Sequence, residues 1–484
     1  MTRRLLLGCV YVLLLGAQAA AAQGVRGSVS ALGRRIDIRK IALDSVAANL
    51  VIIGADSIPR YQGFRVNCAG GPSCTFYRPG DQAAAWFITQ DLDVSAWGLG
   101  APGLSATVLL RTRQAPNSDF EWPRSGDAFD AILAYAEWNR ERYRLRAGRQ
   151  RITSGLGFTG FDGIEAQWLP NQRLRFELFG GRSLARGLED ARNTALEAIE
   201  DFLPDQAAYL FGGAARVQGA RAALGLQYQR EIWSDRHGLI SERAALDART
   251  AWLAPVELEA AADYDFAFGH IGKAHVTAHW MGGAVPLTID ATVRRYVPYF
   301  ELWTIWGFFS PVAYHEAEIQ AGWRLSQKSV LSGGIGYRQY GDTDAPVVFD
   351  PLEDDVLRVQ LRGRHELTPA IGLDAEYRLD RGFGAFLSSG SLGATWMPAP
   401  RWRTELHASA SQQILEFRFG EGAVVGAGAS AETDVHSNLT LSAGVELYRQ
   451  LFQNRPTAVD WNQTRAFFGA RFDFGRDPGL EPAR

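Results

Sequence analysis

Apolar and polar side chains alternate along most of this chain, and the stretch from Val356 to Asp380 shows the pattern well. Successive residues of a β-strand point to opposite faces of a sheet, so the pattern predicts two antiparallel strands with one apolar and one charged face. The apolar positions are Leu357, Val359, Leu361, Leu373, Ala375, Tyr377 and Leu379, and the charged or polar positions are Arg358, Gln360, Arg362, Arg364, Asp374, Glu376, Arg378 and Asp380.

The same alternation recurs from the N-terminal part of the chain to its end, in segments of about ten or more residues, long enough for a tilted strand to cross a bilayer. Ten short turns rich in Gly, Pro, Asn and Ser separate these segments, at 100–103, 139–140, 169–172, 218–219, 254–255, 282–286, 326–329, 367–370, 398–400 and 436–438. Longer and more polar or irregular connections lie between the turns, at 114–127, 184–205, 298–311, 341–353 and 452–463.

Short turns at one end and long connections at the other are typical of outer-membrane barrels. Ten hairpins, an N-terminal strand near 26–37 and a last strand near the end give 22 strands, within an expected range of 18 to 22. We therefore predict an all-β fold, a transmembrane antiparallel β-barrel with periplasmic N- and C-termini. A barrel of this size has a lumen that strand side chains alone do not fill.

Tryptophan placement supports a membrane barrel, because such barrels carry aromatic girdles at both interfaces. Seven tryptophans fall within a few residues of the short turns and in phase with the apolar face of their strands. They are Trp138, Trp168, Trp252, Trp280, Trp323, Trp396 and Trp402.

Residues 1–22 have the pattern of a secretory signal peptide, with Arg3 and Arg4, an apolar run over 5–17 and small residues before Gln23. A lipoprotein signal ending at Cys9 is the alternative, but cleavage there leaves an apolar run of only a few residues. We expect a signal peptide at 1–22, an outer-membrane barrel at 23–475 and a short C-terminal tail at 476–484. Residues 23–484 contain no apolar run of about 18 to 20 residues, so no transmembrane helix is expected.

The last strand carries Phe468, Ala470, Phe472 and Phe474 on one face and resembles the terminal recognition strand of outer-membrane barrels. We therefore expect the barrel-assembly machinery as a partner during insertion, outer-membrane lipid as the surroundings, and the outer membrane of a Gram-negative-type bacterium as the location.

Cys68 and Cys74 lie in a polar loop, and in an oxidising compartment they predict a local disulfide. A metal site would need further ligands, and none are spaced nearby, so neither a metal nor a cofactor is expected. The net charge of −3 and the apolar content of 46% resemble those of a soluble protein, yet they also suit a barrel in which every second strand residue faces water. No nucleic-acid partner is expected.

The polar phase of the strands, assigned to the lumen, forms a basic and an acidic sector. Facing sectors of opposite charge would set up a transverse field for polar solutes, although a lumen wall can also be charged merely to be wetted. The basic candidates are Arg142, Arg144, Arg146, Arg173, Arg175, Arg358, Arg362 and Arg364, and the acidic candidates are Glu257, Glu259, Asp263 and Asp265.

Two of the longer connections have patterns of their own. Segment 184–205 has apolar residues at three- and four-residue steps, which predicts a helix either in the lumen or at the rim. Segment 296–309 is too apolar for a solvated loop, so it either plugs the barrel or presents aromatic faces to a sugar or hydrophobic ligand. Its candidate residues are Tyr299, Phe300, Trp303, Trp306, Phe308 and Phe309.

The stretch 145–150, followed by Gly155-Leu156-Gly157 and by 161–165, resembles a strand-loop-strand passage of the alginate-export type of porin. That resemblance implies an 18-stranded barrel exporting an anionic polysaccharide through an arginine-rich lumen. It would make Arg144, Arg146 and Arg149 candidates for contact with an anion.

The leading interpretation is therefore a porin-like channel for the diffusion or export of polar, anionic or saccharide solutes. The alternative is a surface polysaccharide- or ligand-binding barrel whose lumen is closed by inward-folded loops. A TonB-dependent receptor would carry a plug domain of more than a hundred residues before the barrel, whereas strand patterns begin here soon after residue 23. No catalytic residues are assigned, because none of the eight histidines stands beside a recognisable nucleophile motif, and we do not expect an enzyme.

Overall fold

The computed structural model describes most of the barrel. The described residues are 24–54, 58–62, 64–68, 70–116, 129–184, 207–234, 238–283, 285–297, 313–341, 355–382, 385–412, 422–452 and 462–475. Several predicted features lie outside them: the signal peptide, the tail 476–484, almost all of segment 184–205, and the six aromatic residues Tyr299, Phe300, Trp303, Trp306, Phe308 and Phe309.

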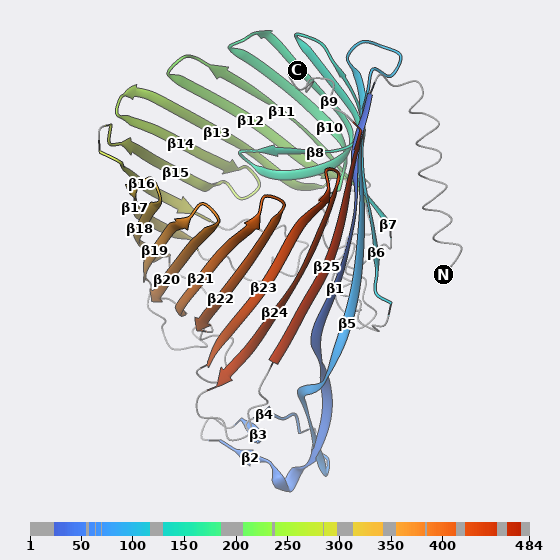
Figure 1. Ribbon diagram of the computed structural model, residues 1–484, viewed down its shortest axis with the longest axis vertical. Coiled ribbons are helices and arrows are strands. Elements are labelled where there is room, and N and C mark those ends of the chain that lie inside the picture. Colours follow the sequence, from blue (N-terminus) through green and yellow to red (C-terminus); the bar gives the residue numbers. More distant parts are fainter. Residues whose placement is uncertain are drawn as a thin grey trace.

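The described secondary structure is almost entirely β (Figure 1). The strands are β1 (Gly24–Ala47), β2 (Ile52–Ile53), β3 (Pro59–Tyr61), β4 (Phe64–Arg65), β5 (Ser73–Trp97), β6 (Leu104–Gln114), β7 (Phe129–Asn139), β8 (Tyr143–Ser154), β9 (Gly157–Asn171), β10 (Leu174–Ser183), β11 (Ala208–Gln218), β12 (Ala222–Trp233), β13 (Leu239–Leu253), β14 (Val256–Asp265), β15 (His270–Met281), β16 (Leu287–Tyr296), β17 (Tyr314–Ser326), β18 (Ser329–Tyr340), β19 (Asp355–Thr368), β20 (Ile371–Gly382), β21 (Ala385–Ala399), β22 (Trp402–Gln412), β23 (Gly422–His436), β24 (Leu439–Phe452) and β25 (Asn462–Gly475). One 3₁₀ turn, η2, spans Ala48–Leu50. No described helix is long and apolar enough to cross a membrane.

Twenty-two of these strands form one closed antiparallel barrel. Each pairs with its neighbours in sequence, apart from the small strands β2 to β4, and β1 closes the ring by pairing with both β5 and β25. Closure removes the free sheet edges that an open sheet would expose. The predicted antiparallel β-barrel and the count of 22 strands are confirmed.

All ten predicted short turns join neighbouring strands of the barrel. The first residues of β1 pair with the last residues of β5 and β25, as in Gly24 with Trp97 and Arg26 with Gly475. The described barrel therefore begins and ends at the end that carries the short turns. Six of the seven tryptophans predicted beside these turns are exposed; Trp280 is half-buried.

Strand register keeps the two phases of the alternation apart. Between β19 and β20, Leu361 pairs with Tyr377, while Arg358 pairs with Asp380. The same match continues through neighbouring strands, so the apolar row forms one face of the wall and the charged row the other. Because the apolar row carries the exposed tryptophans and leucines, we take it as the outer face and the polar row as the lumen face.

The hairpin of β1 and β5 extends well beyond its neighbours, and Figure 1 shows it projecting below the barrel. Pairing of β1 with β25 ends at Ile36, whereas pairing with β5 continues to Ala47. We call the part formed by residues 37–47 and 73–87 the ribbon. Strands β2, β3 and β4 form a three-stranded sheet at its tip.

A small core and a disulfide hold the tip together. Val46, Val66, Cys74 and Phe76 are buried against one another, and the predicted Cys68–Cys74 disulfide is present. Next to the tip, on the side nearer the barrel, the Arg78 Nε donates to the Asp44 carboxylate at 2.7 Å and lowers the pKa of Asp44. The tip is thus a compact unit outside the barrel wall.

Candidate functional site in the barrel lumen

The predicted lumen residues lie on four strands and two short turns, and most point to the lumen face. Arg142 and Arg173 are the exceptions, because they lie in the turns before β8 and β10 rather than on strands. The remaining predicted arginines and acids belong to β8, β10, β14 and β19. The basic sector is therefore smaller than the alternation predicts.

Most of the predicted arginines carry a carboxylate partner. Arg144 Nη2 donates to Glu165 at 2.5 Å, and Arg146 bridges Glu165 and Glu137 at 3.2 and 2.7 Å. The other predicted arginines with described partners are Arg175 with Glu177 at 3.2 Å, Arg358 with Glu316 and Asp380 at 3.0 and 3.2 Å, and Arg362 with Glu376 at 3.7 Å. Paired in this way, these side chains line the lumen without forming a row of uncompensated cations.

The four predicted acids are also engaged. Glu257 pairs with Arg249 of β13, and Glu259 lies 3.8 Å from His279, which in turn contacts Asp290 at 2.7 Å. The two aspartates accept backbone hydrogen bonds instead: Asp263 from Lys273, and Asp265 from Ala267 and Phe268. Asp265 therefore shapes the β14–β15 turn.

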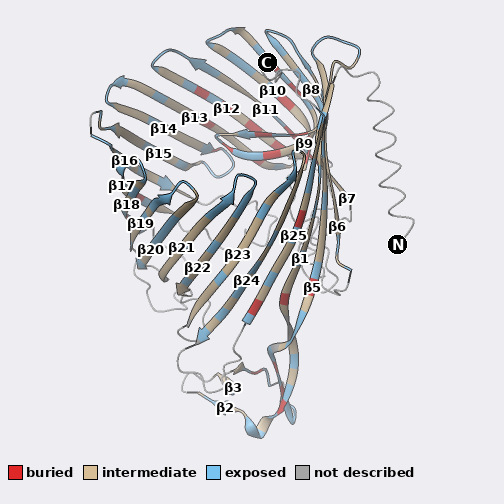
Figure 2. Cartoon of the chain, in the orientation of Figure 1, coloured by how far each residue is buried: buried red, intermediate tan, exposed pale blue. Residues whose placement is uncertain are grey.

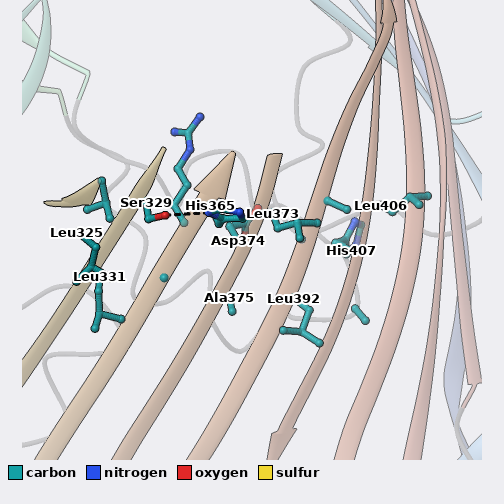
Figure 3. Close-up of a pocket in the computed structure, with 16 residues that line it drawn as sticks. Leu325, Ser329, Leu331, His365, Leu373, Asp374, Ala375, Leu392, Leu406 and His407 are labelled. Carbon is teal, nitrogen blue, oxygen red and sulfur yellow. Dashed lines mark hydrogen bonds between the residues drawn. The ribbon is translucent and has the colours of Figure 1, made fainter. Parts of the chain in front are cut away.

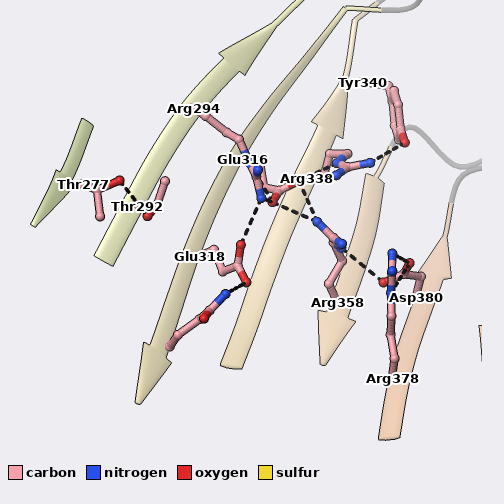
Figure 4. A network of polar contacts seen from close by, with 11 residues as sticks. Thr277, Thr292, Arg294, Glu316, Glu318, Arg338, Tyr340, Arg358, Arg378 and Asp380 are labelled. Carbon is pink, nitrogen blue, oxygen red and sulfur yellow. Dashed lines mark hydrogen bonds and ion pairs between the residues drawn. The ribbon is translucent and has the colours of Figure 1, made fainter. Parts of the chain in front are cut away.

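The most concentrated polar cluster of the lumen centres on Glu316 of β17 (Figure 4). Sequence patterns place Arg358 and Glu316 on the lumen face but do not show that they meet. The Glu316 side chain is 0% exposed and accepts from Arg294, Arg338 and Arg358 on three neighbouring strands. Register explains the convergence, because Arg294 and Arg338 lie directly opposite Glu316 on either side. A buried carboxylate is stable when cations and hydrogen bonds surround it in this way.

The cluster continues onto β20 and toward the ends of the strands. Asp380 links Arg358 with Arg378, and Arg294 also reaches Glu318 at 3.0 Å. Arg338 lies 4.0 Å from the centre of the Tyr314 ring, a cation–π contact. The four arginines and three carboxylates leave one excess positive charge within this Glu316 cluster.

The hairpin of β8 and β9 leaves the wall and packs onto the lumen face of the strands that follow it. Gln229 of β12 donates to Thr159 of β9 at 3.4 Å, although β10 and β11 lie between these strands in the ring. At the turn, a Cβ added to Gly155 would lie 3.2 Å from the Cβ of Ala245 on β13. Adjacent strands are about 4.8 Å apart, so these contacts require the hairpin to curl inward.

A small apolar core fixes the inward position of the hairpin. Ile152 and Phe161 of the hairpin are buried against Phe179 of β10 and Leu210 of β11. Figure 2 shows buried positions gathered on these strands, while most of the remaining wall is half-buried or exposed. The hairpin therefore occupies part of the lumen as a packed element.

Glycines mark the line along which the hairpin bends. Gly148 has φ +125°, and a Cβ there would lie 2.2 Å from the Ala134 carbonyl oxygen. Its register partner Gly163 lies so close to Gly180 that an added Cβ would be 2.1 Å from the Gly180 oxygen. Only glycine fits such close backbone approaches.

The sequence contains a signal for this bend. Before the glycines, the outer-face row of β8 is apolar, with Leu145 and Ala147; beyond them, the same row carries Arg149 and Arg151. Such charges are costly on a lipid-facing strand, but not on a hairpin that has left the wall. Arg149 therefore lies on the opposite face from Arg144 and Arg146, with which the alginate-type resemblance grouped it.

A concavity lies on the outer face, at the short-turn end of β17 to β22 (Figure 3). Leucines Leu331, Leu373, Leu392 and Leu406 border it, and small residues such as Ala375 form its floor. Its apolar lining fits a surface in contact with lipid chains.

The chain is similar in structure to the siderophore receptor PirA from Pseudomonas aeruginosa, with 11% identity, coverage of 93% of this chain and 80% of PirA, and a TM-score of 0.52. The two proteins share a fold. Weaker similarities include OccAB4 from Acinetobacter baumannii (8% identity, 94% and 99% coverage, TM-score 0.41) and a BenF-like porin from Pseudomonas fluorescens Pf-5 (9%, 94% and 100%, 0.38). No family model and no curated protein sequence matches the chain. None of these comparisons supports the predicted resemblance to alginate-export porins.

Proposed function

We propose that this protein is an outer-membrane channel for polar solutes, saccharides included, in a Gram-negative-type bacterium. The observation that carries the proposal is a closed 22-stranded ring with an apolar outer face and a charged inner face. A ring of this width is too large for strand side chains to fill, so its polar face lines water. The long connections face the cell exterior, and the short turns, with both ends of the barrel, face the periplasm.

The inward hairpin of β8 and β9 narrows this passage. Its packed face is fixed by Phe161, Phe179 and Leu210, and its other face presents Arg149, Arg151 and Asp162 to the remaining space. Because most lumen arginines already have carboxylate partners, the wall suits polar solutes in general. An arginine-lined route dedicated to an anionic polysaccharide is a narrower possibility, which the pairing of Arg144 and Arg146 disfavours.

Single-channel recording in planar bilayers tests the proposal. The wild-type protein should conduct, and a variant in which residues 151–160 are replaced by a short Gly-Ser turn should conduct more. A matched control shortens the ribbon tip, 48–72, which lies outside the barrel wall and should leave conductance unchanged. Silence of both the wild type and the hairpin variant would contradict a channel.

The alternative is a ligand-binding barrel whose lumen is closed, and the inward packing of the hairpin is the observation that favours it. In that case the wild type would be silent and the hairpin variant would conduct. The same recordings therefore distinguish a narrowed channel from a plugged barrel.

A further inference from the structure

Among the described strands of the ring, β7 and β8 share the fewest residue pairs. These strands share six residue pairs, from Asn139↔Arg144 to Ala134↔Arg149, whereas each other neighbouring pair in the ring shares nine or more. Beyond Ala134, β7 continues to Phe129 and pairs only with β6 within the described part of the chain. We call the unpaired stretch between residues 129–133 of β7 and 150–154 of β8 the seam.

The seam lies within the span that crosses the membrane. From Trp138, at the short-turn interface, to Ala134 the strand advances roughly 13 Å along its length. The apolar belt of an outer-membrane barrel is about 25 Å tall, and a tilted strand needs about 9 to 11 residues to cross it. The seam therefore begins near the middle of the belt and extends into its outer half.

An unpaired strand edge at this depth has a high energetic cost in lipid. A backbone group without a hydrogen-bond partner is strongly unfavourable in hydrocarbon, so irregular backbone at membrane depth occurs only against protein or water. The described residues supply one partner to this edge: Arg149 Nη1 donates to the Ala131 carbonyl at 3.0 Å. The rest of the edge is best satisfied by water from the lumen.

Arg149 sits where the two strands diverge. It forms two hydrogen bonds with Asp162 of β9, at 2.8 and 2.9 Å, and lies 3.9 Å from Asp130 of β7. These contacts hold the start of the seam together while leaving the outer part unpaired. The backbone pairing of β7 with β8 therefore ends at a defined set of side-chain contacts.

The groups that flank the seam combine a cation with apolar rings. On the hairpin side, the Arg151 guanidinium lies 5.4 Å from the centre of the Phe158 ring. On the wall side, Phe129 is exposed, as is Phe158. A cation beside aromatic rings fits a molecule with an anionic head and an apolar tail.

We propose that the seam is a lateral opening through which an amphipathic anion, such as a long-chain carboxylate, moves between the lumen and the outer leaflet. The head would stay in the aqueous lumen near Arg151 while the tail passes between the two strand edges. The proposal rests on the proposed function for its membrane setting, and it adds a second route to the axial passage.

Disulfide trapping tests whether the seam is open. If pairing continued past Ala134, Leu133 would face Gln150, so a Leu133→Cys/Gln150→Cys variant would oxidise readily. We expect it to stay reduced in native outer membranes. The matched control, Ala136→Cys/Ala147→Cys, joins true register partners and should form its disulfide. Cross-linking of the seam pair as efficient as that of the control would overturn the proposal.

A transfer assay tests what the seam does. The probe is a dansylated undecanoate, which becomes fluorescent on entering the bilayer of liposomes that contain the full-length protein. A bis-maleimide bridge across Ile132→Cys/Thr153→Cys should abolish the protein-dependent signal and leave axial ion conductance unchanged. Transfer that persists despite the bridge would contradict the lateral opening but not the channel. Absence of conductance in the unbridged protein would contradict the channel itself.

Discussion

Arg149 and Asp162 face each other across β8 and β9 and share two parallel hydrogen bonds, Nε to Oδ1 at 2.8 Å and Nη2 to Oδ2 at 2.9 Å. Both residues continue the row that, nearer the short turns, carries the outward-facing Leu145 and Ile164. A bidentate ion pair in that row is compatible with the membrane only because the hairpin has left the wall. The pair thus marks where a membrane strand becomes a lumen element.

The bend at Gly148 should be intolerant of any side chain. Gly148→Ala would place a Cβ 2.2 Å from the Ala134 oxygen at a φ of +125°, which costs about 1–3 kcal/mol in backbone strain before the clash is relieved. We expect a lower yield of folded barrel, measured by heat-modifiable migration in SDS gels. The matched control is Gly372→Ala, since a Cβ there meets nothing within 4 Å. Equal folding of the two variants would contradict this account of the bend.

The regular part of the fold could be predicted from the sequence, because a membrane wall imposes a period of two on every strand. The turn at 254–255 and the girdle residue Trp252 illustrate this, because both can be recognised from the alternation of the residues next to them in the sequence. The closing contacts of β1 with β25 follow once the strands are counted, since a barrel must pair its ends.

The polar contacts of the lumen could not be predicted from the sequence, because they depend on register between strands. Glu316 meets Arg338 only because the β17–β18 turn sets their offset, and Arg358 reaches it from a strand further away. The inward hairpin was missed for another reason. Its signal, charged Arg149 in the apolar phase, becomes readable only when Gly148 is recognised as a bend.

Removal of the negative charge of Glu316 should weaken the wall and change its selectivity. Glu316→Gln leaves Arg294, Arg338 and Arg358 without their shared carboxylate, so we expect a loss of about 2 kcal/mol in folding free energy. The excess positive charge of the cluster rises, so the reversal potential in a KCl gradient should shift toward anion selectivity.

The control for Glu316 is Glu405→Gln. Glu405 pairs with Arg403, and both side chains are largely exposed, so this pair contributes little to stability. Its loss should leave the thermal midpoint of the folded band nearly unchanged. A Glu316 variant as stable as the Glu405 variant would show that the buried cluster contributes no net stability.

The disulfide should stabilise the ribbon tip independently of the barrel. A Cys68→Ser/Cys74→Ser variant reopens a short loop, at a cost of about 2 kcal/mol to the tip core of Val46, Val66 and Phe76. We expect limited proteolysis of intact cells to cut the tip faster, with unchanged heat-modifiable migration of the barrel. Loss of the folded barrel band would contradict the independence of the tip.

Protonation of Asp44 in acid should destabilise the part of the ribbon between the tip and the barrel. The Arg78 guanidinium donates to the Asp44 carboxylate and lowers the pKa of Asp44 below its ordinary value of 3.8. A carboxylate whose folded pKa is lowered stabilises the folded form at neutral pH, and this contribution is lost as the pH falls through the lowered pKa. Amide hydrogen exchange of peptides covering 42–47 and 73–78, corrected for intrinsic rates, should therefore accelerate between pH 5 and pH 3, and in Asp44→Asn it should be fast at both. A wild-type ribbon equally protected at both values would show that the pair does not hold these strands together.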